Sequence, residues 1–242
     1  MNEAYLYPYS ADEARRLGEI NEWRESYRLN KACKGAIEEA IRNNFDGMHL
    51  NADCAKSVIE EYGFKRVNYV LANTVQRLDW DGRFSDANKE WAKGSYIPHD
   101  KEHNRDFVVG SHPAVLDGFI NQARRAYDAL GLFEHGQCEA DSRERDYEGK
   151  VLVLSPNILK ERAWSGENQL WLATGGFGCN PDSSGRAVFA TCLSDGEKTR
   201  WNRSDFVGIL KDEHLPEWAR EKLEQLTAQQ NDAQQMNGME ML

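Results

Sequence analysis

The residues most indicative of chemistry are the two histidines of His99-Asp-Lys-Glu-His103, which match the H-x-x-E-H pattern of inverted zincins. On a helix, His99 and His103 would share a face and could both bind zinc, with Glu102 as general base. His112 or Cys138 could supply a third ligand. However, the segment follows a proline in a polar region without an apolar face, so we expect a charged loop. We therefore predict no metal site and no cofactor, and keep a zinc-dependent hydrolase as an alternative hypothesis.

Two further patterns could serve catalysis. The glycines of Gly175-Gly-Phe-Gly178 follow an expected strand, but neither a P-loop nor a dinucleotide-binding motif follows them. We interpret them as permitting tight backbone geometry between two strands. A Cys-His pair stays open, because such partners lie far apart in sequence. We predict no catalytic residue from these patterns.

The five cysteines are widely and irregularly spaced and include no C-x-x-C pair. We expect reduced thiols, as in the cytosol. Cys33 and Cys54 lie on apolar helical faces and are predicted to pack in a core.

A basic ribbon is expected in the second half of the chain. The dipeptide Asp195-Gly196 is a strong signal for a β-hairpin between the segments 185–193 and 197–202. The cationic side chains of this hairpin could bind phosphate, and its one aromatic residue could stack on a base. The alternative is an edge strand whose charges protect it from aggregation. The predicted nucleic-acid-binding residues are Arg186, Arg200, Trp201 and Arg203.

The stretch from Arg66 to Trp91 combines an apolar helical face with a polar one. Asp81-Gly82 ends the first helix, and Ser85 can cap a short second helix. The apolar face holds Val67, Val70, Leu71, Thr74, Val75 and Leu78. We expect the polar edge to be exposed and to bind a partner through Arg66, Asn73, Arg77 and Arg83. The alternative is structural: Asn68, Asn73 and Gln76 satisfy buried backbone groups or helix ends.

The residues described so far lie in two halves of the chain that differ in their predicted secondary structure. In the first, helical periodicity recurs with capping signals: a capping box at Ser10 and Glu13, and Pro113 opening a helix. In the second, short apolar runs such as 151–154 and 170–173 predict strands. We predict an α+β fold: an all-helical domain over 1–131, a linker over 132–149, a small antiparallel domain with a C-terminal helix over 150–230, and a disordered tail over 231–242.

The net charge of −10, from 40 acidic and 30 basic residues, argues against nonspecific coating of nucleic acid. It suits a basic protein partner or mimicry of nucleic acid, and the main alternative is the ordinary acidity of a well-solvated surface. The chain has no apolar run of the ~18–20 residues that span a bilayer, and its first residues lack the features of a signal peptide. We expect a cytoplasmic protein without a membrane partner.

Several motifs carry a family resemblance: Tyr5-Leu-Tyr-Pro-Tyr-Ser10, Glu22-Trp-Arg-Glu-Ser-Tyr27, Val70-Leu-Ala-Asn-Thr-Val75, Asp81-Gly-Arg-Phe-Ser85 and Asn88-Lys-Glu-Trp91. They resemble a domain-of-unknown-function family typical of integrative and conjugative elements of gut bacteria. The second half is similar to a tail shared among such element-borne proteins, through Val151-Leu-Val-Leu-Ser-Pro156, Gln169-Leu-Trp-Leu-Ala173, Gly176-Phe-Gly-Cys179 and Gly185-Arg-Ala-Val188.

The resemblance implies a setting and no established catalytic residue. Accessory proteins of conjugative elements often defeat host defences. It therefore implies an anti-defence protein, in its most specific form a CRISPR-Cas inhibitor that binds the effector nuclease or its guide complex. The expected partner is a host defence protein or ribonucleoprotein. The first alternative is a nucleic-acid-binding accessory protein of conjugation.

Overall fold

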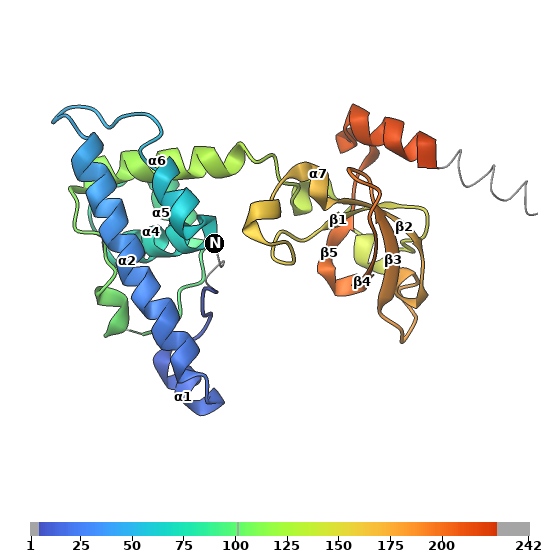
Figure 1. The fold of residues 1–242 in the computed structure, drawn as a ribbon, viewed down its shortest axis with the longest axis horizontal. Coiled ribbons are helices and arrows are strands. Elements are labelled where there is room, and N and C mark those ends of the chain that lie inside the picture. Colours follow the sequence, from blue (N-terminus) through green and yellow to red (C-terminus); the bar gives the residue numbers. More distant parts are fainter. Residues whose placement is uncertain (1–4, 101, 227–242) are drawn as a thin grey trace, which may run out of the picture. The chain divides into compact units, whose positions relative to one another are not determined.

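The computed structural model describes residues 5–100 and 102–226 and confirms the predicted α+β class (Figure 1). The chain divides into two compact units, Met1–Ala129 and Leu130–Leu242. Each is described by itself below. Among the described residues, no helix combines the length and the apolar composition needed to cross a membrane. The tail predicted over 231–242 lies outside the described residues.

The first unit is helical throughout its described elements. Its helices are α1 (Ala11–Leu17), α2 (Ile20–Asn44), α3 (Lys56–Tyr62), α4 (Phe64–Arg77), α5 (Asp86–Lys93) and α6 (Pro113–Asp128). Ser10 caps α1 by accepting a hydrogen bond from the backbone of Glu13, and Ser85 caps α5 in the same way from Asn88. Pro113 opens α6 as predicted, since its missing N–H is not needed there.

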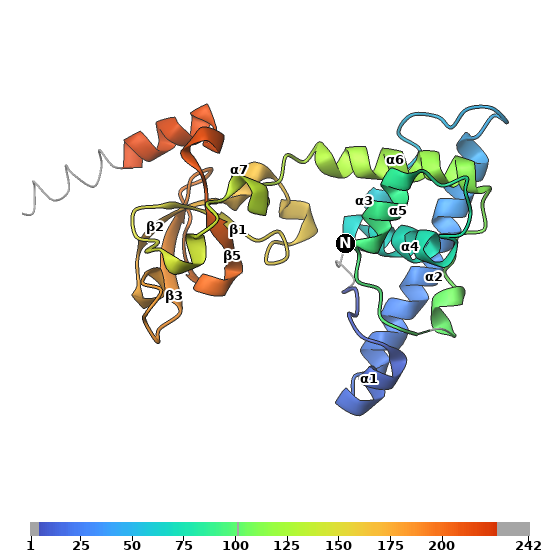
Figure 2. The same cartoon turned by 180° about the vertical axis from the view of Figure 1, so that it is seen from behind.

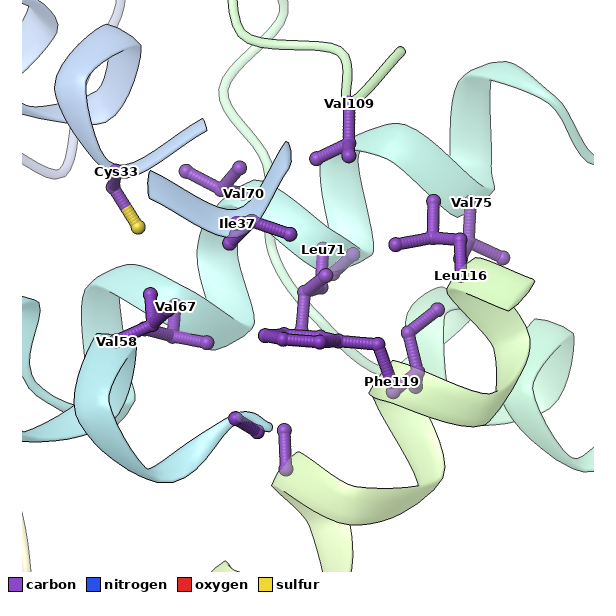
Figure 3. Close-up of a cluster of buried hydrophobic side chains, with 14 of the residues drawn as sticks. Cys33, Ile37, Val58, Val67, Val70, Leu71, Val75, Val109, Leu116 and Phe119 are labelled. Atoms are coloured by element: carbon purple, nitrogen blue, oxygen red, sulfur yellow. The ribbon is translucent and has the colours of Figure 1, made fainter. Parts of the chain in front are cut away.

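The central helix of this unit is α4, which packs against α2, α3, α5 and α6 (Figure 2). Its aliphatic side chains are fully buried because they repeat at helical spacing and meet apolar faces from each neighbour. Figure 3 shows Leu71 close to Phe119 of α6, with Ile37 of α2 nearby. The apolar half of the Arg66–Trp91 stretch is therefore the spine of the unit.

The second unit is built on a five-stranded antiparallel sheet of order β4-β3-β2-β1-β5. Its elements are β1 (Val151–Leu154), α7 (Gly166–Gln169), β2 (Leu170–Gly175), β3 (Ala187–Cys192), β4 (Lys198–Asn202) and β5 (Phe206–Ile209). The predicted hairpin is the β3–β4 pair, in which Phe189 lies opposite Arg200. A helix over 217–226 follows the sheet.

Both faces of the sheet carry an apolar core, because alternate residues of each strand point to opposite sides. One core contains Leu152, Trp171 and Val188, and the other contains Val153 and Leu172, with Trp218 of the C-terminal helix packed against it. A sheet covered on both faces explains why its central strands read as continuous apolar runs.

The segment 132–149, predicted as a linker, instead belongs to the second unit. Cys138 forms a β-bridge with Leu210, and Tyr147 is only 1% exposed and sits in the sheet's core. The polar composition of the segment predicted a linker because few of its residues face inward. Backbone hydrogen bonds hold the other residues against the sheet. One of these bonds runs from the N–H of Tyr147 to the carbonyl of Cys179.

Candidate functional site

The histidine motif does not form the helix that the zinc hypothesis requires. His99 is exposed in an extended segment, whereas His103 opens a short 3-10 turn, so the two rings share no helical face. The Nδ1 atom of His103 lies 2.7 Å from Oδ1 of Asp100. Within the residues that the structure describes, no three His, Cys, Asp or Glu side chains are grouped so as to hold a metal ion.

His103 instead belongs to an aromatic cluster of the first unit. Its ring lies edge-on to those of Trp23 and Tyr27, with centroids 4.8 and 5.5 Å away. Burial raises the pKa of the Asp100 carboxyl, but hydrogen bonds from His103 and from the backbone of Ala11 outweigh it, and the net pKa is lowered. The cavity beside the cluster measures about 20 Å³, which is room for one water molecule. This arrangement ties the loop after α5 to α1 and α2.

Two of the residues predicted to form an exposed edge are buried. Arg66 is 2% exposed, and its guanidinium donates to the carbonyl oxygens of Ser26 and Tyr5 and to the side chain of Asn30. Asn73 is 1% exposed and donates to the carbonyl of Asn104 at 2.9 Å. Helical spacing placed both on a polar face correctly. It gave no sign that the N-terminal segment and the loop after α5 cover that face.

The other two residues of the predicted edge lie nearer the surface. Arg77 is half-buried in the last turn of α4. Arg83 is exposed and donates to both carboxylate oxygens of Asp81, at 2.9 and 2.6 Å. These hydrogen bonds are the first cause of a pKa of about 2 for Asp81. The far side of the guanidinium reaches His112, with Nη1 3.4 Å from Nε2.

His112 in turn lines an open groove of about 260 Å³ between α2 and the start of α6. Ile41, Phe45 and Val115 give the groove apolar walls, and Arg42 and His112 place exposed polar groups on it. The side chain of Glu38, also in the lining, accepts from the N–H of Gly110 at 2.5 Å and pairs with Lys34. A hollow with apolar walls and an exposed arginine is a suitable receptor for one anchoring side chain of a protein. The sequence offers no signal for this groove, because its walls come from segments about 70 residues apart.

In the second unit, the structure divides the predicted basic ribbon into two sets. Arg203 is turned inward: its guanidinium lies 3.7 Å from the ring centroid of Tyr147. It also donates to five backbone carbonyl oxygens, those of Gly178, Cys179, Ser142, Arg143 and Arg145. Its donors hold the segment 142–145 and the turn after β2 together.

Trp201 also faces the core. Its ring meets Trp171 edge-on with centroids 5.2 Å apart, and it packs on the apolar cluster of that sheet face. Its Nε1–H is buried and has no hydrogen-bond partner among the described residues. Trp201 is therefore partly buried against the core and less accessible to a base than the exposed Phe189.

Arg186 and Arg200, the other predicted set, are exposed. The cross-strand partner of Arg200 is Phe189, an aromatic residue that is 51% exposed. Phe177, just beyond the end of β2, is 79% exposed. Sequence reasoning missed both phenylalanines, although the alternation of β3 places Phe189 on the face opposite Val188 and Ala190.

The glycines around Phe177 have the structural role predicted for them. A Cβ at Gly176 would lie 2.4 Å from the carbonyl oxygen of Ala187, and one at Gly178 would lie 2.3 Å from that of Arg186. At Gly185 an added Cβ would lie 2.5 Å from Cβ of Phe177. The turn after β2 therefore runs against the start of β3 with no room for side chains between them.

All five cysteines are buried free thiols. Cys33 and Cys54 lie in the core of the first unit, as predicted. Burial raises the pKa of Cys33 to about 12 and those of Cys54 and Cys138 to about 11. Burial also raises the pKa of Cys179 and Cys192. These groups are thiols and not thiolates at neutral pH, which makes them poor nucleophiles.

The chain belongs to the family DUF3849, described as a protein of unknown function, whose match covers residues 6–128. The matched region coincides closely with the helical unit. No curated protein matches the chain, and no solved structure does.

Proposed function

We propose that this protein is an accessory protein of a mobile element that acts against host defence in the cytoplasm. It binds a defence effector nuclease, in the specific form of the proposal a CRISPR-Cas effector, through the first unit. The observation that carries the proposal is the groove between α2 and α6, with its apolar walls and the exposed Arg42.

The groove has the composition of a protein-binding hot spot. Buried apolar anchors and arginine dominate the energetics of interfaces, and one aliphatic or aromatic side chain fully removed from water contributes about 1.5–3 kcal/mol. Arg83 lies beside the groove with its guanidinium already oriented by Asp81. A pre-oriented guanidinium loses less conformational entropy when it binds a carboxylate of the partner.

The charge of the chain supports the choice of partner. Effector nucleases hold nucleic acid in positively charged channels, and a protein of net charge −10 is attracted to such a surface. The resemblance to proteins of integrative and conjugative elements supplies the biological setting. In this proposal the groove provides the specific anchor, and the overall acidity raises the rate of association.

A cleavage assay with guide-loaded effector nucleases tests the proposal. Excess protein should stop cleavage of target DNA by at least one effector, and the two should co-purify. Val115→Ala removes an apolar wall and Arg42→Glu reverses a charge at the groove, so each should weaken inhibition at least about tenfold.

Arg24→Glu is the matched control, because it reverses an exposed charge on the same helix, away from the groove. It should inhibit like the unchanged protein. Normal cleavage by every effector at excess protein would contradict the proposal. Equal losses in Arg42→Glu and Arg24→Glu would show that the groove is not the specific anchor.

A further inference from the structure

A part of the sheet in the second unit is left open beside the C-terminal helix. On the face that carries Leu170 and Leu172, the helix over 217–226 packs against the apolar residues. Further along the same strands that face is exposed, at Thr174 of β2 and Phe189 of β3. We call this exposed area the open sheet face. It consists of Thr174, Phe189, Lys198, Arg200 and Asn202.

Register places the cations of β4 on the same side as the exposed ring. Phe189 pairs with Arg200 and Thr191 pairs with Lys198, and side chains opposite each other in an antiparallel pair lie on one face, about 4.5–5.5 Å apart at Cβ. The hydroxyl of Thr174 is fixed by donating to the carbonyl oxygen of Phe189 at 3.1 Å.

No acidic residue occurs in β2, β3 or β4, whose sequences are LWLATG, AVFATC and KTRWN. Two carboxylates border the face: that of Glu197 accepts a hydrogen bond from Thr199, which belongs to the opposite face of β4, and that of Asp205 accepts one from the backbone N–H of Asn202 at the end of β4. The open sheet face is therefore a local cationic area on a chain of net charge −10. Repulsion of phosphate by the whole molecule is opposed here by two close positive charges.

We propose that the open sheet face binds single-stranded nucleic acid, with a base stacked on Phe189 and the neighbouring phosphates held by Arg200 and Lys198. Exposed aromatic rings on antiparallel sheets stack unpaired bases, which are sequence-tolerant ligands because every base has a flat face. A duplex keeps its bases inside the stack and offers no such partner. This site lies in the second unit and does not rest on the groove of the first.

The proposal replaces Trp201 and Arg203 of the predicted ribbon with Phe189 and Lys198 and keeps Arg200. The reason is geometric: Trp201 and Arg203 are engaged with Trp171 and Tyr147, whereas Phe189 and Arg200 face solvent. Arg186 is exposed just before β3, in register with Val188 on the other side of the strand, and is not part of the open sheet face.

Fluorescence anisotropy with labelled 20-nucleotide oligouridine and oligothymidine tests the site, with a 20-base-pair duplex RNA as comparison. The full chain should bind both single strands and bind the duplex at least about tenfold more weakly. Phe189→Ala should weaken binding about 5- to 100-fold, the range of one lost stacking contact. Arg200→Ala should weaken it and reduce the slope of log K against log salt by roughly 0.7.

Two matched variants serve as controls: Tyr96→Ala removes an aromatic side chain that is 77% exposed in the first unit, and Lys222→Ala removes an exposed cation of the second. Both should bind like the unchanged protein. Absence of single-strand binding, equal binding of duplex, or unchanged affinity in Phe189→Ala and Arg200→Ala would each overturn the proposal.

The assay contains no defence protein, so its outcome is separate from that of the cleavage assay. If Phe189→Ala lost inhibition of an effector while the unchanged protein bound no oligonucleotide, the open sheet face would be a protein-binding surface and this inference would be wrong.

Discussion

At the scale of single residues, some polar side chains of this protein form hydrogen bonds that stabilise the fold, and others are accessible to a partner. Arg83 does both: it holds Asp81 and borders the groove. Asp81 has a pKa of about 2, below the ~3.9 of an unfolded chain, so its contribution to stability is present above about pH 4. That contribution is lost as the pH falls towards 2.

Replacing Arg83 by glutamine should raise the pKa of Asp81 towards about 3.9, because the charged donor that stabilises the carboxylate is gone. A pH titration of the side-chain carboxyl carbons by NMR measures it. Asp46 is the internal control, since backbone N–H groups of His49 and Met48 lower its pKa and Arg83→Gln leaves them in place. An unchanged midpoint for Asp81 would refute the assigned cause.

Arg203 was predicted to bind nucleic acid, but in the structure its guanidinium makes contacts that stabilise the fold. Arg203→Ala leaves five carbonyl oxygens without this donor and removes the stacking on Tyr147, so we expect it to lower the free energy of unfolding by about 2–3 kcal/mol. Arg200→Ala removes an exposed guanidinium and should change stability by about 0.5 kcal/mol or less. Denaturant unfolding compares the two. Equal losses would show that Arg203 is not the structural tie described above.

At the scale of elements, the turn after β2 depends on glycine. Gly178→Ala places a Cβ against the backbone of Arg186, and since backbone atoms give way only by shifting a strand, we expect a loss of about 1–3 kcal/mol. Gly136→Ala meets nothing within 4 Å and should be close to neutral. Thermal unfolding of both variants checks the expectation, and a neutral Gly178→Ala would contradict the close approach.

The sequence predicted helix starts and the hairpin well, because these features depend only on residues that are neighbours in the chain. Ser10, Ser85 and Pro113 start helices as expected, and Asp195-Gly196 lies between the paired strands of a hairpin. The helix that opens at Ser10 is short, because Gly18 adopts a left-handed conformation with φ of 76° and ends it before α2 begins at Ile20.

The candidate site was less predictable because burial depends on distant segments. Arg66 and Asn73 lie on the expected polar face of α4, yet the N-terminal segment and the loop after α5 accept their hydrogen bonds. Likewise, Trp201 and Arg203 follow the alternation of the hairpin, but only the packed sheet shows that they face Trp171 and Tyr147. The spacing of residues predicts which face of a helix or strand a side chain lies on, but it does not predict which distant segments pack against that face.

At the scale of the whole molecule, the family match and the first unit end at almost the same place, residue 128 against Ala129. The groove lies in the unit that defines the family, and the open sheet face lies in the unit outside the match. The two proposed surfaces, one on each unit, fit the proposal of a composite partner such as a ribonucleoprotein.

The central claim is that the groove of the first unit anchors a defence effector. Its most direct measurement is the Kd of the full chain for a guide-loaded effector nuclease, compared among the unchanged protein, Arg42→Glu and Arg24→Glu. The account predicts a Kd at least about tenfold higher for Arg42→Glu and an unchanged Kd for Arg24→Glu. Binding that is the same in all three proteins, or absent for every effector tried, would contradict it.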